Sequence, residues 1–500
     1  MRASMGCGSL TLGVALVSLL TAVQTASART EIGDPDITLA VERQFMHDPA
    51  VPFNAIDVDS SKGIVRLSGQ VSSFGAKMQA LRIAETVKGV RAVVDELIVE
   101  PTSLSPEQIQ KDVTAALAAD PATRDYHLTA MVDTSGTVTL LGTAHSWAEH
   151  EIAAHVAGSV RGVREIDNDI ELDFLVKRTD SQIQADIKER LRWDTLVDDS
   201  LIDVKVRGGL VTLSGIVGSA AEARRAQLDA RVTGVNDVKA DALKVERWAR
   251  DDDLRSSKYV QKSDEEIRKA VQAALLYDPR VNPFPVDVGV DDGQVSLSGA
   301  VGNLKAKRAA TDTARNTVGV IGVDNYLRVR PADHFGAQTI ENRVREAFMR
   351  DALIDSHDIF VDANDGVVSL FGNVDSPIEK SQAEDVASRV AGVTEVRNYL
   401  TVERLGVAIP LPGGYGWYPY DYSYRSTDTP ADDAAIAANI RQEIYWSPYV
   451  DRADVVVHVD DGVATLTGTV KSRAERAAAV ASAYEGGARR VKDEIKLATG

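Results

Sequence analysis

Three histidines, His145, His150 and His155, recur along the chain at intervals of five residues. Imidazole nitrogens are common zinc ligands, so three of them together would suggest a metal centre. We expect this stretch to be one helical segment, in which a step of five residues rotates the side chain by about 140°. Three such side chains cannot converge on one ion. The histidines therefore predict a solvated helix surface and no metal site.

Asp57, Asp59 and Ser61 precede Gly63 in a pattern that partly resembles a calcium-binding loop. Lys62 stands where that loop requires glycine, and no bidentate glutamate follows at the required distance. The same residues fit the turn of a β-hairpin better. The sequence also contains no paired acid and base, no activated nucleophile and no Cys–His arrangement that stands out. We expect no catalytic residue, no cofactor and no metal, and a protein that is not an enzyme.

A motif of the form Gly-x-Val-x-Leu-x-Gly, first seen at 63–69, occurs six times in the chain, with Ala464 in place of the valine in the last copy. The closing glycines are spaced 73, 73, 84, 73 and 96 residues apart: Gly69, Gly142, Gly215, Gly299, Gly372 and Gly468. A Gly-Val pair follows each of them after about 20 residues, degraded to Gly487-Ala488 in the last copy. This period is longer than a solenoid unit. Each copy therefore predicts a small domain with its own core.

The residues around each motif predict its secondary structure. Apolar residues before it fall at every fourth position, as at Ile37, Val41 and Phe45, which makes one helical stripe. Alternating apolar residues around an Asp-Gly or similar turn then predict a β-hairpin, and a second helix and a third strand follow. We expect an α+β tandem array of six modules, each with two helices on one face of a three-stranded sheet. The closing glycines should be structural, because the backbone needs a positive φ or approaches another backbone there.

The helix stripe, the hairpin motif, the Gly-Val pair and the closing strand together resemble the BON domain (bacterial OsmY and nodulation) family. The resemblance covers 35–100, 104–174, 178–246, 263–330, 336–404 and 431–498. The sixth copy departs from the pattern at 486–488, and the third has Trp193-Asp194-Thr195 where other copies have Asp-Pro. The family implies exported or envelope-associated proteins that contact phospholipid or protein. It also implies a role in envelope integrity or osmotic protection, and no enzymatic activity.

The first 28 residues have the features of a secretory signal peptide. Arg2 precedes an apolar run from Leu10 to Val23, and Ala26-Ser27-Ala28 forms a small-residue cleavage site. Cys7, the only cysteine of the chain, lies within this segment. The mature chain is therefore expected to contain no disulfide and no thiolate site. We expect a periplasmic protein, secreted through a cleaved signal peptide.

The chain is acidic, with a net charge of −18 that becomes −19 without the signal peptide. An acidic protein is a poor candidate for nucleic-acid binding, so we expect none. The charge is unevenly distributed: repeat two has 4 basic and 12 acidic residues and repeat five has 7 and 13, whereas repeats three, four and six have 11 and 12, 9 and 9, and 9 and 11. The nearly neutral repeats meet the smallest repulsion at an anionic surface. We expect peripheral contact with anionic phospholipid or with envelope proteins, and no transmembrane segment.

Two helix ends combine aromatic and basic residues in the way an interfacial contact needs. They contribute Arg192 and Trp193 in repeat three, and Tyr445, Trp446 and Tyr449 in repeat six. A Gly- and Pro-rich linker, 405–430, carries Trp417 among five tyrosines. These residues are candidates for lipid or partner contact. The alternative is that the rings cover the helix ends, and that the linker docks on its own neighbouring repeat.

We therefore expect an exported scaffold of the cell envelope, in which weak contacts by several modules add up through the linkers. This scaffold would support envelope integrity or tolerance of osmotic stress. The alternative is a periplasmic chaperone-like stress protein that holds unfolded clients in shallow apolar grooves. A lipid binder should bind anionic vesicles in a salt-dependent way, whereas a chaperone should suppress aggregation of a client without lipid.

Overall fold

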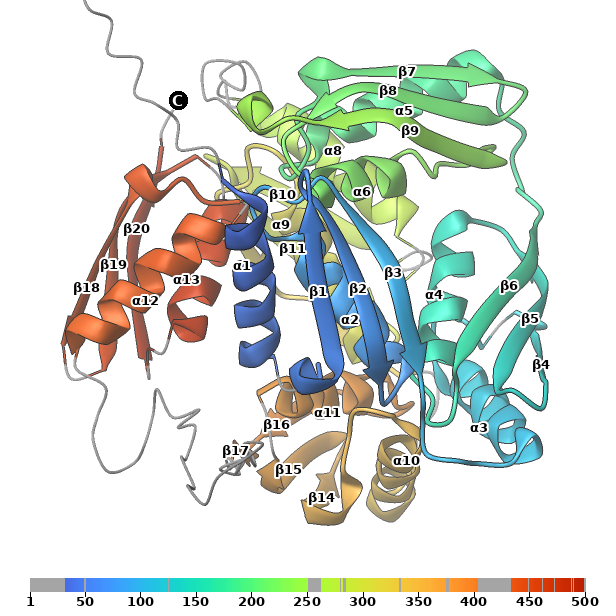
Figure 1. The fold of residues 1–500 in the computed structure, drawn as a ribbon. Helices are drawn as coiled ribbons and strands as arrows, with labels where there is room; N and C mark the ends of the chain where they lie inside the picture. The colour runs from blue at the N-terminus through green and yellow to red at the C-terminus, as the bar shows by residue number, and fades with distance from the viewer. Residues whose placement is uncertain are drawn as a thin grey trace, which may run out of the picture.

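The computed structural model describes residues 32–498, apart from 49–50, 125, 251–261, 279, 282–284, 332–333, 375–376, 403–432, 448, 461, 472, 487 and 489. The expected signal peptide and Trp417 lie outside the described residues. The described chain forms six modules of the same construction (Figure 1). The predicted α+β array is thereby confirmed.

The first three modules have the following elements. Module 1 consists of α1 (Asp34–His47), η1 (Phe53–Ala55), β1 (Ile56–Ser61), β2 (Ile64–Val71), α2 (Phe74–Glu85) and β3 (Ala92–Val99). Module 2 consists of α3 (Pro106–Ala119), β4 (Thr129–Val132), β5 (Thr137–Ala144), α4 (Trp147–Gly158) and β6 (Glu165–Leu172). Module 3 consists of α5 (Asp180–Trp193), η2 (Asp199–Leu201), β7 (Ile202–Arg207), β8 (Leu210–Val217), α6 (Ala220–Asp229), β9 (Asp237–Val245) and η3 (Arg247–Arg250).

The other three modules repeat this order. Module 4 consists of α8 (Asp264–Tyr277), β10 (Val286–Asp291), β11 (Gln294–Val301), α9 (Leu304–Arg315), β12 (Gly322–Asn325) and β13 (Arg328–Val329). Module 5 consists of α10 (Ala337–Arg350), η4 (Ser356–Asp358), β14 (Ile359–Asn364), β15 (Val367–Val374), α11 (Pro377–Arg389), β16 (Glu395–Asn398) and β17 (Thr401–Val402). Module 6 consists of α12 (Asp433–Trp446), η5 (Arg452–Asp454), β18 (Val455–Asp460), β19 (Val463–Val470), α13 (Arg473–Glu485) and β20 (Arg490–Leu497).

The strand that carries the glycine motif lies in the middle of each sheet. In module 1, β2 is antiparallel to β1 and parallel to β3, and α2 makes the crossover between the two parallel strands. In modules 4 and 5 the third strand is interrupted after Asn325 and Asn398. There the Asn side chain accepts a hydrogen bond from the N–H of Leu327 at 3.0 Å or of Leu400 at 3.2 Å. Asp95 and Asp493 make the same bond in modules 1 and 6, where the third strand is continuous, so this bond does not by itself divide the strand.

An aspartate at the start of the first helix holds the hairpin turn in four modules. In module 4 the Asp264 carboxylate accepts hydrogen bonds from the N–H groups of Asp292 and Gly293, both at 2.9 Å. Asp292 has a φ of 47°, in the left-handed region. The turns of modules 1, 3 and 6 are held in the same way by Asp34, Asp180 and Asp433. Modules 2 and 5 have Pro106 and Ala337 at this position.

Each module has its own cluster of buried apolar side chains, formed by the helix stripes and one face of the sheet. Ile37, Val41 and Phe45 of the predicted stripe are all buried. Neighbouring modules add to these clusters. Ala220 of module 3 belongs to the core of module 1, and Leu304 of module 4 to the core of module 5. The cores are therefore separate but in contact.

The glycine that closes the second strand has a steric reason in every module. Gly372 has a φ of 120°, and a Cβ at this position would lie 1.9 Å from the carbonyl oxygen of Asp358. No other residue fits so close to a backbone carbonyl without displacing it. The five equivalent glycines also have positive φ: Gly69, Gly142, Gly215, Gly299 and Gly468.

The modules pack around one another into a single body (Figure 1). Module 1 lies among the others, with module 6 to its left, module 3 above, module 2 to the right and module 5 below. Second helices of different modules face each other. Arg224 of α6 pairs with Glu85 of α2 at 2.8 Å, and Lys305 of α9 with Asp385 of α11 at 3.3 Å. The modules are therefore held by specific contacts and not by the linkers alone.

Candidate functional site

Trp193, one of the predicted contact residues, lies at the end of α5 beside module 4. Its carbonyl oxygen accepts a hydrogen bond from the N–H of Val318 at 2.9 Å, and its indole N–H donates to the Glu189 carboxylate at 2.6 Å. The Lys262 ammonium lies 6.0 Å from the centre of the indole ring. Arg192 is exposed. The helix end is therefore partly a contact between modules and partly free surface.

Modules 3 and 4 are joined there by a short antiparallel bridge. Asp194 pairs with Thr317, and the N–H of Thr195 donates to the carbonyl of Asn316 at 3.2 Å. Together with the bond to the Trp193 carbonyl, this makes two backbone hydrogen bonds between modules. The turn after the first helix of module 3 thus meets the turn after the second helix of module 4.

Modules 2 and 5 use the same bridge between the equivalent turns. Val160 pairs with Asp351, Arg161 donates its N–H to the Arg350 carbonyl at 2.8 Å, and Ala352 donates to the Ser159 carbonyl at 2.9 Å. The Arg161 guanidinium also donates to two carbonyl oxygens of module 5, those of Asp351 and Ile354, at 3.2 and 2.9 Å. This interface therefore has both backbone bonds and an additional side-chain anchor.

Modules 1 and 6 meet through the same elements. The N–H of Lys88 donates to the carbonyl of Trp446 at 3.0 Å, and the Lys88 ammonium lies 5.1 Å from the centre of the Tyr445 ring. The indole of Trp446 packs against the core of module 1, whereas Tyr449 packs against the core of its own module. The first module is thus paired with the sixth, the second with the fifth, and the third with the fourth.

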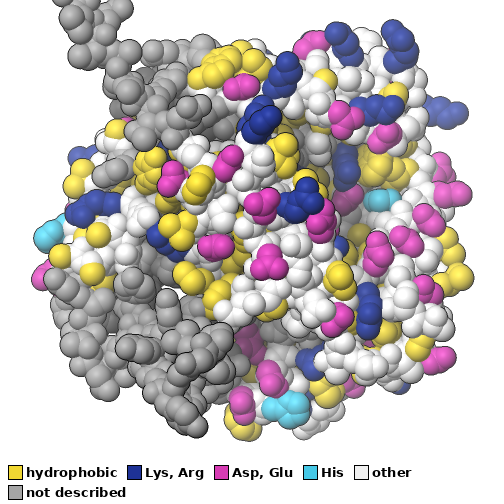
Figure 2. Space-filling model, in the orientation of Figure 1, with side chains coloured by type: hydrophobic (Ala, Val, Ile, Leu, Met, Phe, Trp, Pro, Cys, Tyr) yellow, Lys and Arg dark blue, Asp and Glu magenta, His cyan; other side chains and the backbone are white. Residues whose placement is uncertain are grey.

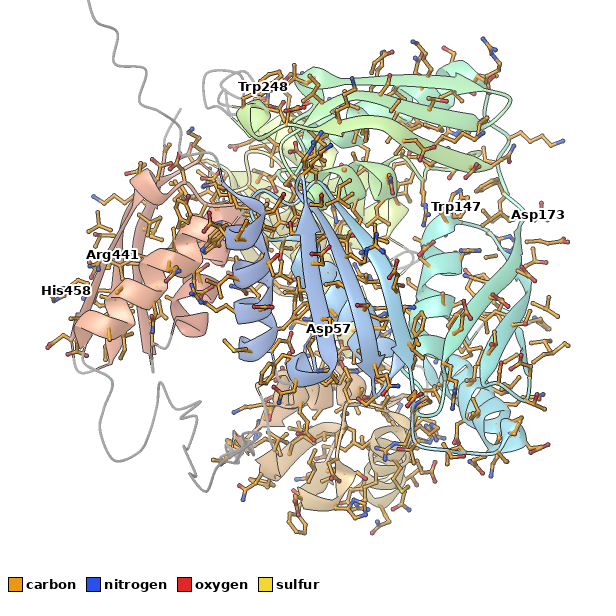
Figure 3. All side chains as sticks on the ribbon, in the orientation of Figure 1. Asp57, Trp147, Asp173, Trp248, Arg441 and His458 are labelled. Carbon is orange, nitrogen blue, oxygen red and sulfur yellow. The ribbon has the colours of Figure 1, made fainter. Side chains whose placement is uncertain are left out.

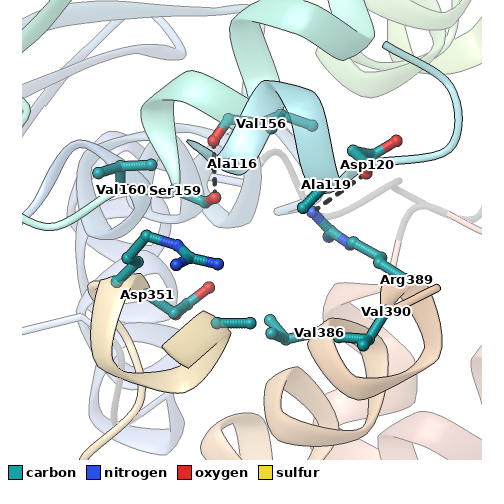
Figure 4. A pocket seen from close by; sticks show the side chains of 12 residues that line it. Ala116, Ala119, Asp120, Val156, Ser159, Val160, Asp351, Val386, Arg389 and Val390 are labelled. Atoms are coloured by element: carbon teal, nitrogen blue, oxygen red, sulfur yellow. Dashed lines mark hydrogen bonds and ion pairs between the residues drawn. The ribbon is translucent and has the colours of Figure 1, made fainter. Parts of the chain in front are cut away.

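A small cavity lies between modules 2 and 5, lined by equivalent residues from both (Figure 4). Its volume is about 60 Å³. Ala116 and Asp120 line one side, Ala347 and Asp351 the other, and the Arg389 guanidinium approaches the Asp120 carboxylate to 3.9 Å. Ligand pockets are typically several hundred Å³, so this space suits a few water molecules and no organic substrate. We regard it as a feature of the interface.

The buried charges near this cavity form ion pairs between elements. Burial raises the pKa of Asp351 to about 6, although the hydrogen bonds that it accepts from Gln382 and Leu353 act to lower it. Burial also acts on Asp385, but Arg389 and Lys305 lower the pKa of its carboxyl to about 2. Among the residues that the structure describes, no three His, Cys, Asp or Glu side chains are grouped as metal ligands. These charges form ion pairs between helices, as Lys305 of α9 does with Asp385 of α11.

The three histidines do not share one helix, contrary to expectation. α4 begins at Trp147, so His145 precedes it, and its Nδ1 atom lies 2.8 Å from the carbonyl oxygen of Asp173. Ser146 caps the helix and so excludes His145 from it. His150 lies within α4 and pairs with the Asn168 side chain at 3.1 Å. Trp147, labelled in Figure 3, instead donates its indole N–H to the Val235 carbonyl of module 3 at 2.6 Å.

Burial redistributes the charge of module 3. Its 12 acidic residues include four that are buried, Asp194, Asp198, Glu222 and Asp229, whereas none of its 11 basic residues is buried. Burial and the neighbouring Asp194 carboxylate raise the pKa of Asp229. Two of the eleven basic residues, Arg190 and Arg225, pair with the buried Asp229 and Asp194, so nine basic and eight acidic residues remain for the rest of the surface. Figure 2 shows Lys and Arg side chains along the upper right edge, where β7–β9 lie. The composition alone had indicated a nearly neutral module.

An exposed row of three aromatic rings crosses the open face of the module 5 sheet. Phe360 and Phe371 are cross-strand partners, and the Phe371 and Tyr399 rings stack with their centroids 5.2 Å apart and their planes 12° apart. Their exposed fractions are 69%, 44% and 57% in the order Phe360, Phe371, Tyr399. Sequence reasoning missed this row because Phe360 and Phe371 lie in two different strands and Tyr399 lies in the interruption between β16 and β17. The register brings them together.

No helix in the described part of the chain is long and apolar enough to cross a membrane. The described architecture is thus a set of α+β modules, joined in pairs, with two unusual surfaces: the basic face of module 3 and the aromatic row of module 5.

Comparison with known proteins identifies the module. The family model of the BON domain matches 33–101, 105–173, 179–247, 263–331, 337–404 and 432–499. The chain therefore belongs to the BON domain family.

Two characterised relatives resemble parts of the chain. Osmotically-inducible protein Y of Escherichia coli is 31% identical over 143 residues, which are 27% of this chain and 71% of that protein. Outer membrane lipoprotein DolP of Haemophilus influenzae is 27% identical over 168 residues, 32% of this chain and 86% of that protein. A solved structure of CdsD, a structural protein of the type III secretion system of Chlamydia trachomatis, has 16% identity and a TM-score of 0.12, with 42% of this chain and 91% of that chain covered.

Proposed function

We propose that this protein is an exported scaffold of the cell envelope that rests on anionic phospholipid surfaces through module 3. The observation that carries the proposal is the open face of the module 3 sheet, where four exposed lysine and arginine side chains outnumber two carboxylates within an acidic chain. Each lysine or arginine close to an anionic bilayer contributes about 1 kcal/mol of attraction. Contact of this kind is peripheral and requires no membrane-spanning helix. The protein then acts as a binding protein and not as an enzyme.

The open face of the module 3 sheet is the part that we assign to the contact. Lys205 and Lys239 both pair with Thr212 in the ladder, so the three side chains lie in one row on the same face. Arg207 and Lys244 are also exposed on the outer strands β7 and β9. Asp203 and Asp237 lie on the same face, and Lys205 pairs with Asp203 at 3.2 Å, so the four cations leave a surplus of two positive charges. Several cations on one face can meet several headgroups at once, so that their individually weak attractions add.

The neighbouring module 2 has the opposite charge. Its strand β6 exposes four carboxylates in alternate positions: Glu165, Asp167, Asp169 and Glu171. Such a row is repelled by an anionic bilayer. The two modules therefore favour one orientation, in which module 3 faces the lipid and the acidic row of module 2 faces away. The acidic side stays free for other envelope proteins.

The relatives support a location in the envelope. One is by its name inducible by osmotic conditions, and the other is an outer membrane lipoprotein. We propose that this chain is likewise periplasmic, secreted through the signal peptide at 1–28, and that it supports envelope integrity under osmotic stress. Six modules in one body make several simultaneous contacts, so that weak individual binding becomes useful avidity.

The helix-end residues take unequal shares in this proposal. Arg192 is exposed on module 3 and is available to a phosphate group. The rings of Trp193, Tyr445 and Trp446 are half-buried beside neighbouring modules, and Tyr449 is half-buried on its own core. We therefore assign these rings a smaller share in lipid contact. Trp417 remains a candidate outside the described residues.

Co-sedimentation with vesicles tests the proposal. The chain should sediment with vesicles that contain phosphatidylglycerol, bind pure phosphatidylcholine vesicles weakly, and dissociate as salt is raised. The double variant Lys205→Glu, Lys239→Glu should lower the affinity for phosphatidylglycerol vesicles at least tenfold, because four units of charge change on the contact face. The matched control is Lys492→Glu, Lys496→Glu, which makes the same charge change on exposed residues of β20 in module 6. Equal losses in both double variants, or no loss in the first, would contradict the proposal.

A second candidate function is favoured by the aromatic row of module 5. Three exposed rings on the sheet that begins with the edge strand β14 offer an apolar surface that an extended, unfolded client can use. A chaperone of this type should suppress the aggregation of a heat-denatured test protein without lipid. Phe360→Ser with Phe371→Ser should abolish that suppression and leave vesicle binding intact. If the lysine double variant abolishes it instead, the aromatic row is not the client site.

A further inference from the structure

The pairing of modules 1 and 6 differs from the other two pairings in the number of backbone bonds. Each of the other pairs is closed by two backbone hydrogen bonds between the turns. In the described part of the module 1–6 interface there is one, from Lys88 to the Trp446 carbonyl. The residue equivalent to the second donor, Ala352 in module 5, is Pro448, which has no N–H group. The sequence itself therefore removes one bond from this interface.

The side chains at this interface make it specific despite the missing bond. The Trp446 indole packs against the core of module 1, the Lys88 ammonium lies over the Tyr445 ring, and the Gln44 amide donates to the Glu443 carboxylate. Trp and Tyr in such positions commonly provide most of the energy of an interface. Module 1 thus presents a formed docking surface whose occupant is the end of α12.

The connection between modules 5 and 6 is far longer than those between some other neighbours. Thirty residues, 403–432, separate β17 from α12, whereas 100–105 alone separate modules 1 and 2. A segment of thirty residues can reach at most about 100 Å when fully extended. Its length therefore allows the sixth module to reach a module 1 other than its own. The shorter connections of the inner modules do not allow such an exchange.

We infer that module 6 exchanges between copies of this chain, so that the Tyr445–Trp446 helix end of one molecule docks on module 1 of a second. Such an exchange preserves every contact of the closed molecule and adds a reciprocal link between two copies. The internal arrangement competes through an effective concentration of about 1 mM. The exchanged dimer should therefore form when the protein is crowded, as it is on a membrane surface. An envelope scaffold would gain from it a link that forms only where molecules accumulate.

Thiol cross-linking with a short bismaleimide in the full-length mature chain tests this inference, since the long side chains at this contact leave the two backbones too far apart for a disulfide to be assumed. With Cys7 absent from the mature chain, the double variant Gln44→Cys, Glu443→Cys carries only the two new thiols. The reagent should give a cross-link within one chain at about 10 µM protein, and a covalent dimer in addition near 1 mM. The control is Arg308→Cys, Glu384→Cys, at a contact of 2.5 Å between modules 4 and 5, which the short connection 330–336 keeps within one chain. Absence of a covalent dimer from the first variant at both concentrations would overturn the inference.

A second measurement does not depend on introduced thiols. Sedimentation equilibrium of the unmodified chain should show a monomer–dimer equilibrium, and Lys88→Ala and Trp446→Ala should each reduce the dimer fraction. Lys88→Ala removes only the cation above the Tyr445 ring, so it is the milder change and leaves the backbone bond in place. A dimer that persists undiminished in both variants would show that another surface joins the copies, and would overturn the exchange.

Discussion

Gln44 and Glu443 hold the same position in the first helices of modules 1 and 6, one residue before the buried Phe45 and Ile444, and they meet across the interface. The contact of equivalent residues is the signature of an approximate two-fold axis. Ala116 and Ala347 hold this position in modules 2 and 5, and both line the cavity between them. The side chain at one position therefore decides whether the axis carries a hydrogen bond or an empty space.

Filling that space should stabilise the protein. Ala347→Val adds two methyl groups at the cavity between modules 2 and 5. Because the space is partly open to solvent and Ala347 is half-buried, filling it is worth less than filling an enclosed cavity, and we expect a gain of about 0.5 kcal/mol in the free energy of unfolding. Urea denaturation measures it. The matched change Ala84→Val, at a fully buried alanine of the module 1 core, should instead destabilise by about 1–3 kcal/mol through overpacking. Destabilisation by both changes would show that the cavity cannot accept a larger side chain.

The Asp351 carboxyl should make the stability depend on pH. Burial raises its pKa to about 6 from an ordinary value of 3.8. Since the folded protein binds this proton more tightly than the unfolded chain, the contribution is fully present below about pH 4 and is lost as the pH rises through 6. The difference corresponds to about 3 kcal/mol, at 1.36 kcal/mol for each pKa unit. The stability of the wild type relative to Asp351→Asn should therefore fall by about this amount between pH 4 and pH 7.

Urea denaturation of both proteins across that range provides the measurement. Asparagine keeps the shape of the side chain and does not titrate, so the difference between the two curves isolates the carboxyl. A difference that stays constant with pH would show that Asp351 is solvated, and that the turn between modules 2 and 5 is not closed in solution.

The glycine that closes the second strand should not tolerate a side chain. Gly372→Ala places a Cβ 1.9 Å from the Asp358 carbonyl oxygen at a φ of 120°, so we expect a loss of about 3 kcal/mol or more. Gly336→Ala in the same module is the control. No atom lies within 4 Å of its Cβ position, and a change at a helix start of this kind costs about 0.5 kcal/mol. Thermal unfolding of the two variants separates them, and equal midpoints would refute the steric explanation.

The sequence predicted what depends on short-range patterns. The helix stripe of Ile37, Val41 and Phe45, the hairpins and the α+β repeat were all confirmed, because period and turn chemistry act within one module. The aromatic row of Phe360, Phe371 and Tyr399 could not be predicted, since it requires the register of two strands and the interruption of the third. The basic face of the module 3 sheet was missed for a similar reason. A count of charges does not show which of them lie on one face of a sheet.

The pairing of modules could not be predicted from the sequence for a related reason. The bonds that join Arg161 to Arg350, or Lys88 to Trp446, are made by backbone groups whose pattern carries no residue signature. One sequence feature does relate to the pairing. Trp193 and Trp446 both end a first helix, and in the structure each lies beside another module. At these positions the rings either cover the helix ends or contact lipid. Vesicle binding of the variants Trp193→Ala and Trp446→Ala distinguishes the two.

The aspartate that holds the hairpin turn from the start of the first helix is missing in module 5, although this module has an aspartate–glycine turn like that of module 4. It can be introduced there by substitution. Module 5 has Ala337 where module 4 has Asp264, although its turn, Asp365-Gly366, has the same backbone as Asp292-Gly293, with φ of 48° at Asp365 and 47° at Asp292. Ala337→Asp should therefore supply two hydrogen-bond acceptors to the turn and a favourable charge at the start of α10. We expect a gain of about 0.5 kcal/mol in the free energy of unfolding. Ala337→Asn offers one acceptor and no charge, so it should recover only part of this gain, and urea denaturation should rank the aspartate above the asparagine and the asparagine above alanine. If alanine equals or exceeds aspartate, the carboxylate of Asp264 does not stabilise its own turn, and the recurrence of aspartate at Asp34, Asp180 and Asp433 needs another cause.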